Sequence, residues 1–134
     1  MSGISKEIAQ KEVNKWLDFK KVSNKKREDN ADNIEKIVEG LMDGNLVLDT
    51  DTFVFEHTLC FPIGEEIKIS KLQYQPRVPV KKFQEQMLGL KGEDGYGRVF
   101  AFIAGLSGQS KGVISNMESE DYLLASQIAV FFMA

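Results

Sequence analysis

The segment FVFEHTLCFPIGEEIKISKLQY, residues 53–74, has the sequence pattern from which the fold class of this chain is predicted. Apolar and polar side chains alternate along its first half, and a period of two is typical of a half-buried strand. The segment FPIGEE has the composition of a turn, because Pro62 fixes one backbone dihedral and Gly64 relieves the next corner. The alternation resumes at Ile67 and changes sides after Lys71, which indicates a bulge or a strand end. We therefore predict an antiparallel β-hairpin.

The apolar side of this hairpin carries Phe53, Phe55, Leu59 and Phe61, with His57 on the same side. A two-stranded hairpin alone is marginally stable in water, so helices or a second copy of the chain must cover that side. Unpaired strand edges are also a liability that association between copies removes. We therefore expect a homo-oligomer.

Helical periodicity precedes the hairpin. Residues 5–23 are predicted to form an amphipathic helix with Ser5 as its cap. Its apolar stripe is Ala9, Val13, Trp16 and Leu17. The polar residues 20–33 are interpreted as a frayed helix end and a linker. A second helix is predicted with Asp32 and Glu35 at capping-box spacing. Its apolar face is Ile34, Ile37, Val38 and Leu41, and the segment MDGN, residues 42–45, ends it.

Helical patterns also follow the hairpin. Pro76 and Pro79 end the sheet, and Pro79 suits the first turn of a helix. The apolar face of that helix is Val80, Phe83, Met87 and Leu88. Residues 98–106 form a short helix that is apolar nearly all round, which places it in the middle of a core. Ser115 and Glu118 predict the capped start of a last helix. Its apolar residues are Tyr122, Leu123, Leu124, Ile128, Val130, Phe131, Phe132 and Met133.

These patterns predict an α+β fold: a mostly helical single domain over residues 1–134 with a central antiparallel β-hairpin. The N-terminal helical segment spans 5–44 and holds two helices. The hairpin spans 46–75, and the C-terminal helical segment spans 79–134 with about three helices.

Composition limits the classes of function. The chain has 134 residues and a formal net charge of −3, which argues against a dedicated nucleic-acid binder. Cys60 is the only cysteine, so no internal disulfide can form and a reducing compartment is expected. No apolar run approaches the length of a membrane span, and the charged N-terminus lacks the apolar core of a signal peptide. We expect a cytoplasmic protein with no membrane partner.

The sequence offers no complete metal site. His57 and Cys60 are the only residues of their kinds, whereas a structural zinc site needs about four such ligands. Their odd spacing puts them on opposite faces of a strand, and both are expected simply to pack. The segment DTDTF from Asp49 lacks the later glycine and the closing glutamate of a calcium loop, so it is interpreted as a solvated turn.

Catalytic and cofactor motifs are also missing. Gly92, Gly95 and Gly97 match neither the dinucleotide-binding pattern nor the nucleotide P-loop, and a flexible connection is the better interpretation. Ser107 and Ser110 lie in a glycine-rich loop without the context of a nucleophile elbow. We expect no catalytic, cofactor-binding or metal-binding residues, no cofactor and no enzyme activity.

One electropositive stretch stands out. It consists of Lys20, Lys21, Lys25, Lys26 and Arg27. Acidic residues follow at once and dilute it, so it is interpreted as a solvated helix end. Contact with nucleic acid, as in a small regulatory protein, stays open as an alternative.

The second half of the chain resembles a known family. The segment FEHTLCFPIGEEIKISKLQYQPRVPVKKFQEQM, residues 55–87, is a hairpin that leads into Tyr-x-Pro-Arg and a helix. Residues 98–132 then give a small apolar helix, the motif GLSG, a capped turn, an Asp early in a final helix and a terminal Phe pair. Over roughly residues 53–133 this is similar to the tail assembly chaperones of tailed bacteriophages, especially the Mu-like group. The N-terminal helices at 5–44 fall outside the match.

The resemblance implies a virion-assembly role in the host cytoplasm. Such a protein binds the tape-measure or tail-tube protein and keeps it soluble until the tail is assembled, and no catalytic residues come with that role. A structural subunit of the tail or baseplate, present in the virion, is the alternative.

The terminal aromatic residues raise a question of their own. Successive residues on a helix point about 100° apart, so Phe131 is assigned to the protein's core and Phe132 to a partner or a second copy. The candidate partner-binding residues are Phe132, Met133, Phe53 and Phe55.

Overall fold

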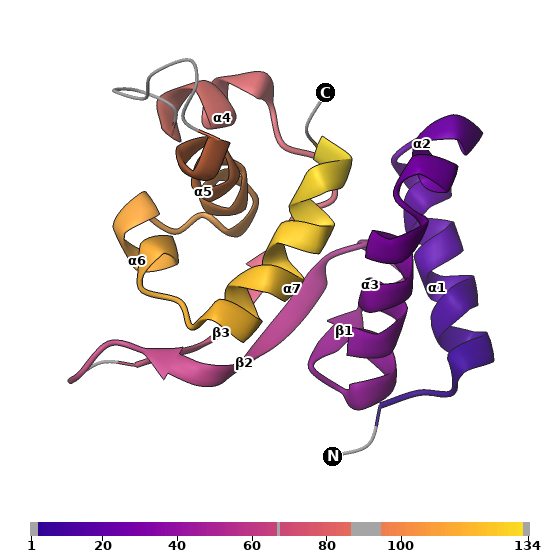
Figure 1. The fold of residues 1–134 in the computed structure, drawn as a ribbon, viewed down its shortest axis with the longest axis horizontal. Coiled ribbons are helices and arrows are strands. Elements are labelled where there is room, and N and C mark those ends of the chain that lie inside the picture. The colour runs from indigo at the N-terminus through magenta and orange to yellow at the C-terminus, as the bar shows by residue number, and fades with distance from the viewer. Residues whose placement is uncertain (1–2, 67, 87–94, 133–134) are drawn as a thin grey trace.

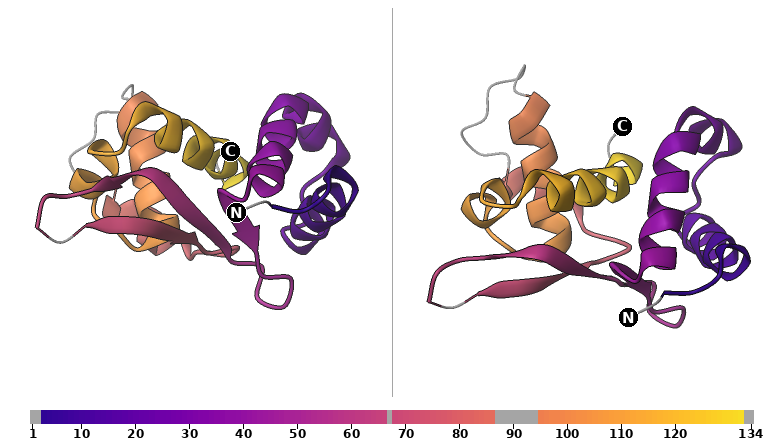
Figure 2. Two further views of the ribbon diagram at one scale, coloured as in Figure 1. Left: turned by 90° about the horizontal axis from the view of Figure 1, so that it is seen from below. Right: turned by 60° about the horizontal axis from the view of Figure 1, so that its bottom comes forward.

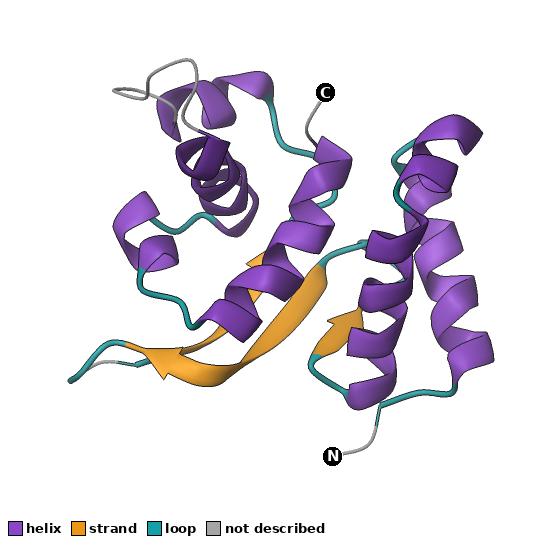
Figure 3. Cartoon of the chain, viewed as in Figure 1, coloured by secondary structure: helices purple, strands orange, loops and turns teal. Residues whose placement is uncertain are grey.

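A computed structural model of the chain describes residues 3–66, 68–86 and 95–132 (Figure 1). The described residues form helices α1–α7, a short 3-10 helix η1 and a three-stranded antiparallel sheet (Figure 3), which confirms the α+β, mostly helical fold class. In chain order the elements are α1 (Lys6–Phe19), α2 (Asn24–Asp29), α3 (Ala31–Asp43), β1 (Leu46–Leu48), β2 (Phe55–Ile63), β3 (Ile69–Tyr74), α4 (Val80–Gln86), α5 (Gly95–Ser107), α6 (Lys111–Ser115), α7 (Ser119–Ala129) and η1 (Val130–Phe132).

Helix α1 follows its prediction closely. The Ser5 hydroxyl accepts a hydrogen bond from the Ile8 N–H at 3.3 Å. The four residues of the predicted apolar stripe are all buried. The helix ends with Lys21 in the left-handed conformation at φ 58°. There the Val22 N–H donates to the Leu17 carbonyl at 3.0 Å, which is the bond that defines a Schellman motif.

Residues 20–33 do not form the frayed helix end and linker that their polar sequence predicted. They contain α2, whose cap is Ser23: its hydroxyl accepts from the Lys26 N–H at 3.2 Å. Helix α3 then starts directly at Ala31, so Asp32 lies within its first turn and the predicted capping box is wrong. The predicted end of this helix is confirmed, because Gly44 closes it in the left-handed conformation at φ 86°.

The sheet contains the predicted hairpin and one more strand. Strand β1 pairs antiparallel with β2, and β2 pairs antiparallel with β3, in the order β1-β2-β3. The turn between β1 and β2 is built by Asp49, whose carboxylate accepts the N–H groups of Asp51 at 2.8 Å and Thr52 at 3.1 Å. Phe53 closes this turn at φ 58° and is therefore not part of β2.

The second half of β2 departs from the predicted alternation. The register with β3 shifts between Thr58 and Ile63, as the change of apolar side had indicated. Phe61 was expected on the buried side, but 51% of its surface is exposed, while Ile63 is buried. The reason is local: Pro62 has no N–H to give to the ladder, so the strand is irregular at this point.

The C-terminal helices differ from their predictions at their ends. In α4, Phe83 is buried as expected, whereas 68% of Val80 is exposed because it occupies the first position of the helix. Met87 and Leu88 lie outside the described residues. The Ser115–Glu118 capping box is wrong, because the Ser115 hydroxyl instead donates to a carbonyl of its own short helix, α6.

Helix α6 itself was not predicted. Its cap is Ser110, whose hydroxyl accepts from the Val113 N–H at 3.2 Å. Helix α5 confirms the predicted buried helix, since Ala101, Ile103 and Leu106 are all at most 1% exposed.

The core lies between the sheet and the helices. Helix α7 packs against β2 and α5 against β3, so helices cover one face of the sheet (Figure 2). On the N-terminal side α3 packs against both α1 and α7. An aromatic cluster joins the two ends of the chain: the Trp16 ring lies 5.1 Å from that of Phe55 and 5.6 Å from that of Phe131, both edge-on.

Candidate interaction site

The most unusual polar feature is a carboxylate buried between α7 and β2. Asp121 is only 2% exposed. One of its oxygens accepts the N–H of Cys60 at 2.9 Å, and the other accepts the N–H of Phe61 at 3.0 Å. These two N–H groups belong to the irregular part of β2. The carboxylate therefore replaces the sheet hydrogen bonds that this segment lacks.

His57 and Tyr74 extend this cluster inward. His57 Nδ1 and the Tyr74 hydroxyl are 2.7 Å apart, and His57 Nε2 lies 3.8 Å from the Asp121 carboxylate. Among the described residues Nε2 has no hydrogen-bond partner. Burial lowers the pKa of His57 to about 4, although the nearby Asp121 acts in the opposite direction. Burial, and then Asp121, raises the pKa of Tyr74.

This Tyr74–His57–Asp121 cluster can act as a brace between elements. All three side chains are at most 2% exposed, so nothing in solution can reach them in this structure. His57 packs as predicted. The role of Asp121 was missed from the residues alone, because an acidic residue in the first turn of a helix is explained just as well by the helix dipole. The sequence signal that pointed to Asp121 was the resemblance described above, in which an Asp early in the final helix is one of the shared features.

The structure describes three of the four candidate partner-binding residues. It corrects the expectation for Phe55, which is completely buried under Trp16 and cannot contact a partner. Phe53 is half-buried and stacks on Phe19 with ring centroids 4.5 Å apart. Met133 lies outside the described residues.

Phe131 and Phe132 differ in burial. Phe131 is 4% exposed and belongs to the core. Phe132 is half-buried, and the ammonium of Lys20 lies 3.3 Å from the centroid of its ring. Lys20 also donates to the Pro76 carbonyl at 3.1 Å. Whether a partner covers the rest of Phe132 stays a prediction.

The basic stretch is tied to the fold more than a solvated helix end would be. Burial, and then the neighbouring Lys26 and Arg77, lower the pKa of Lys20 to about 8. The Lys26 ammonium donates to the Phe131 carbonyl at 3.3 Å, and Arg27 pairs with Asp18 at 2.8 Å. The Lys26 contact holds α2 against η1, and the Arg27 pair holds α2 against α1, so both cations are engaged within the fold.

Several large apolar side chains remain exposed on the surface. Among the described residues they are Ile8, Val47, Phe61, Val80 and Leu123, each between 49% and 68% exposed. Phe61 is the aromatic member and belongs to the last part of β2, and the β2–β3 hairpin extends beyond the helices in Figure 2. Single exposed apolar residues are ordinary, so Phe61 draws attention through its place on this projecting hairpin.

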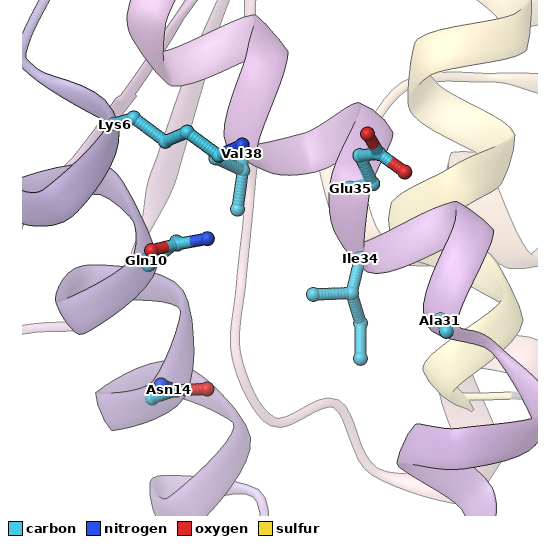
Figure 4. A pocket seen from close by; sticks show the side chains of 7 residues that line it. All are labelled: Lys6, Gln10, Asn14, Ala31, Ile34, Glu35 and Val38. Carbon is cyan, nitrogen blue, oxygen red and sulfur yellow. The ribbon is translucent and has the colours of Figure 1, made fainter.

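Two surface hollows could receive part of a partner. One, of about 360 Å³, lies between α1 and α3, where Gln10 and Asn14 face Ile34 and Val38 (Figure 4). Lys6, Ala31 and Glu35 complete its described lining. Its mixture of amides, both charges and aliphatic groups selects no particular ligand.

The other hollow, of about 300 Å³, lies beside the end of β3. Its described lining comes from the end of β3, the segment before α4, α4 itself and the C-terminal end of α5. Arg77 and Lys82 are its charged residues, and no carboxylate is among the described lining residues. Its electrostatic character is therefore cationic.

The remaining candidate metal ligands do not come together. Cys60 was expected to pack, but it is exposed, because it lies on the outward side of β2 together with Thr58. The Asp49 segment is the exposed turn that was predicted, and its carboxylate is engaged with its own loop. Within residues 3–66, 68–86 and 95–132, no cluster of three or more His, Cys, Asp or Glu residues is placed to hold a metal ion.

No helix in the described part of the chain is both long and apolar enough to cross a membrane. Comparison of the chain with protein-family models, curated proteins and solved structures finds no match.

Proposed function

We propose that this chain is a non-enzymatic assembly protein of a tailed bacteriophage, a tail assembly chaperone that binds the tape-measure or tail-tube protein before assembly. The observation that carries the proposal is the contact between Asp121 and the N–H groups of Cys60 and Phe61. The hairpin, which contains LCFPI at residues 59–63, and the Asp of the final helix are separate features of the resemblance in sequence. In the fold they form a single hydrogen-bonded unit.

The surface of this unit suits protein binding. The carboxylate holds the backbone of the projecting hairpin, and Phe61 stands outward from the same point with half of its surface exposed. Aromatic residues, Phe among them, are enriched in protein interfaces. The half-buried Phe132 is a second candidate anchor. The homo-oligomer expected from the sequence stays a prediction.

Co-expression tests the proposal. The tape-measure and tail-tube proteins of the same phage are produced alone, with the wild-type chain, and with a Phe61→Ser variant. We expect the wild type to keep one of them soluble and to co-purify with it, and the variant to do so less well. Thr58→Ser, a change at an exposed position of the same strand, is the control. Equal solubility of both tail proteins with and without the chain would contradict the proposal.

The alternative of a structural virion subunit makes a different prediction. A chaperone leaves its partner before the particle is complete, so it should be missing from purified particles, whereas a structural subunit should be present in fixed copy number.

A further inference from the structure

The outer edge of β3 is an unpaired strand edge. Thr58 of β2 donates its N–H to the Asn45 carbonyl at 2.8 Å, on the β1 side. Alternate residues of an antiparallel strand direct their main-chain groups to opposite sides, so His57 is directed to β3, where it is the register partner of Leu72. It follows that the residues of β3 on either side of Leu72 direct their main-chain groups away from the sheet.

These outward residues are Lys71, Gln73 and, just past the strand, Gln75. The Gln75 N–H confirms the direction, because it donates to the Leu106 carbonyl of α5 at 3.1 Å. Within the described part of the chain no strand lies next to this edge of β3 (Figure 2). Lys71 and Gln73 therefore offer two successive sets of main-chain donors and acceptors to an added strand.

The cationic hollow lies at the end of this edge. Gln73 and Gln75 form one wall, and residues 105–108 at the end of α5 form another. Arg77 is held in place, since it donates to the Phe19 carbonyl at 3.0 Å and its guanidinium lies 4.3 Å from the Phe19 ring. Lys82 is exposed and has no ion-pair partner among the described residues.

Charge decides the occupant. The carbonyl end of α5 contributes about half a negative charge, and the two full cations outweigh it. An added strand with acidic residues at the end that reaches the hollow would complement both features. In the antiparallel orientation, which is the commoner one for neighbouring strands, that end is the amino-terminal end of the strand.

We propose that the edge of β3 binds an extended segment of a partner protein as an added antiparallel strand, with acidic residues of the segment in the hollow lined by Arg77 and Lys82. The main chain of Lys71 and Gln73 supplies the pairing, and the hollow sets the orientation and the preference for acidic residues. This inference rests on the proposed function in taking the occupant to be a protein client. It does not depend on which tail protein that is.

The test uses the full chain and a fluorescent probe peptide, acetyl-Asp-Glu-Thr-Val-Thr-Val-Thr-amide labelled at its carboxyl end, with binding read by fluorescence anisotropy. Two N-methylated forms of the peptide block alternate main-chain N–H groups. Only one alternate set can face β3, so we expect one form to lose binding and the other to keep it. No binding of the parent peptide, or equal binding of both methylated forms, would overturn strand addition.

A pair of protein variants tests the hollow. Lys82→Glu should weaken binding of the acidic peptide by about tenfold, the effect of replacing an exposed attraction with a repulsion. Lys81→Glu is the matched control, because Lys81 lies next to it on α4, is also exposed and does not line the hollow. A control peptide in which Asn and Gln replace the Asp and the Glu should bind equally to the two variants. Equal loss of acidic-peptide binding in both variants would overturn the role of the hollow.

Further outcomes separate strand addition from its alternatives. If sedimentation shows a dimer that the peptide and Lys82→Glu each dissociate, the occupant is a second copy and the commitment to a partner protein is wrong. If the chain keeps a tail protein soluble but does not bind the peptide, the edge proposal fails and the proposed function stands. If the chain binds the peptide but has no effect on the tail proteins, the edge proposal stands and the proposed function fails.

Discussion

Replacing Asp121 with asparagine should destabilise the protein far more than the same change at an exposed carboxylate of this helix. Asparagine keeps one acceptor oxygen but turns an NH₂ group toward one of the two N–H donors of β2. One charge-assisted hydrogen bond is lost, a buried N–H is left without a partner, and the remaining bond becomes a neutral one. Together these changes should lower the free energy of unfolding by about 2–4 kcal/mol. A domain of this size has about 5–15 kcal/mol in total.

The assay is urea unfolding followed by the fluorescence of Trp16, the only tryptophan. Glu120→Gln is the matched control, because Glu120 is exposed and also lies in the first turn of α7. It removes the same favourable charge at the helix N-terminus, worth about 0.3–1 kcal/mol. The difference between the two variants therefore isolates the hydrogen bonds to β2.

A local measurement accompanies the global one. In the Asp121→Asn variant, the amides of Cys60 and Phe61 should exchange with solvent faster than in the wild type, while amides in α1 keep their protection until global unfolding limits them. If Asp121→Asn is no less stable than Glu120→Gln, the carboxylate does not brace the hairpin and the reasoning is refuted.

Three further predictions concern the rest of the fold. Gly105→Ala should lower the free energy of unfolding by about 1–3 kcal/mol, because its Cβ would lie 2.7 Å from the Phe83 ring. At Gly112 the nearest atom to an added Cβ is 3.8 Å away, so Gly112→Ala should be neutral or slightly stabilising, and thermal melts of the two variants check this difference. Lys21→Gly should stabilise by about 0.5–1 kcal/mol, since glycine adopts φ 58° without strain, and a lower melting temperature would contradict this. The pKa of Lys20 is about 8 in the folded protein and 10.5 ordinarily, so between these pH values the unfolded chain binds one more proton than the folded chain. The free energy of unfolding should therefore rise with pH from about 8 to 10.5. In urea unfolding, Lys20→Met should show a smaller rise over the same range.

Periodic patterns in the sequence predicted most of the elements. The apolar stripe of α1 and the alternation from Phe55 to Leu59 report burial on one side of an element, and burial of that kind is what periodicity measures. The left-handed end of α3 was predictable because Gly44 is the residue that best tolerates that conformation. The same reasoning failed at Lys21, where a lysine takes the conformation because the Schellman motif offsets part of its strain.

The failures share a physical cause, which is that long-range contacts override local patterns. Phe61 has the right parity to be buried, but Pro62 and the carboxylate of Asp121, distant in sequence, redirect the strand. Strand β1 is too short to show an alternation. The basic residues looked solvated because their partners, such as the Phe132 ring and the Phe131 carbonyl, lie at the other end of the chain.

The candidate site was predictable only in part. Phe53 and Phe55 follow the same pattern in sequence, yet one closes an exposed turn and the other is completely buried. The edge of β3 left no sequence signal, because main-chain hydrogen bonding does not depend on side-chain identity.

The proposed role in tail assembly can be tested by mass spectrometry on two samples from one infection. Tagged chain is recovered from cells before lysis together with its bound proteins, and purified particles from the same culture are analysed for the chain. We predict that the tape-measure or tail-tube protein is enriched with the chain before lysis and that the chain is missing from the particles. The proposed role is contradicted if the particles contain the chain in fixed copy number, or if the chain is recovered from the cells without either tail protein.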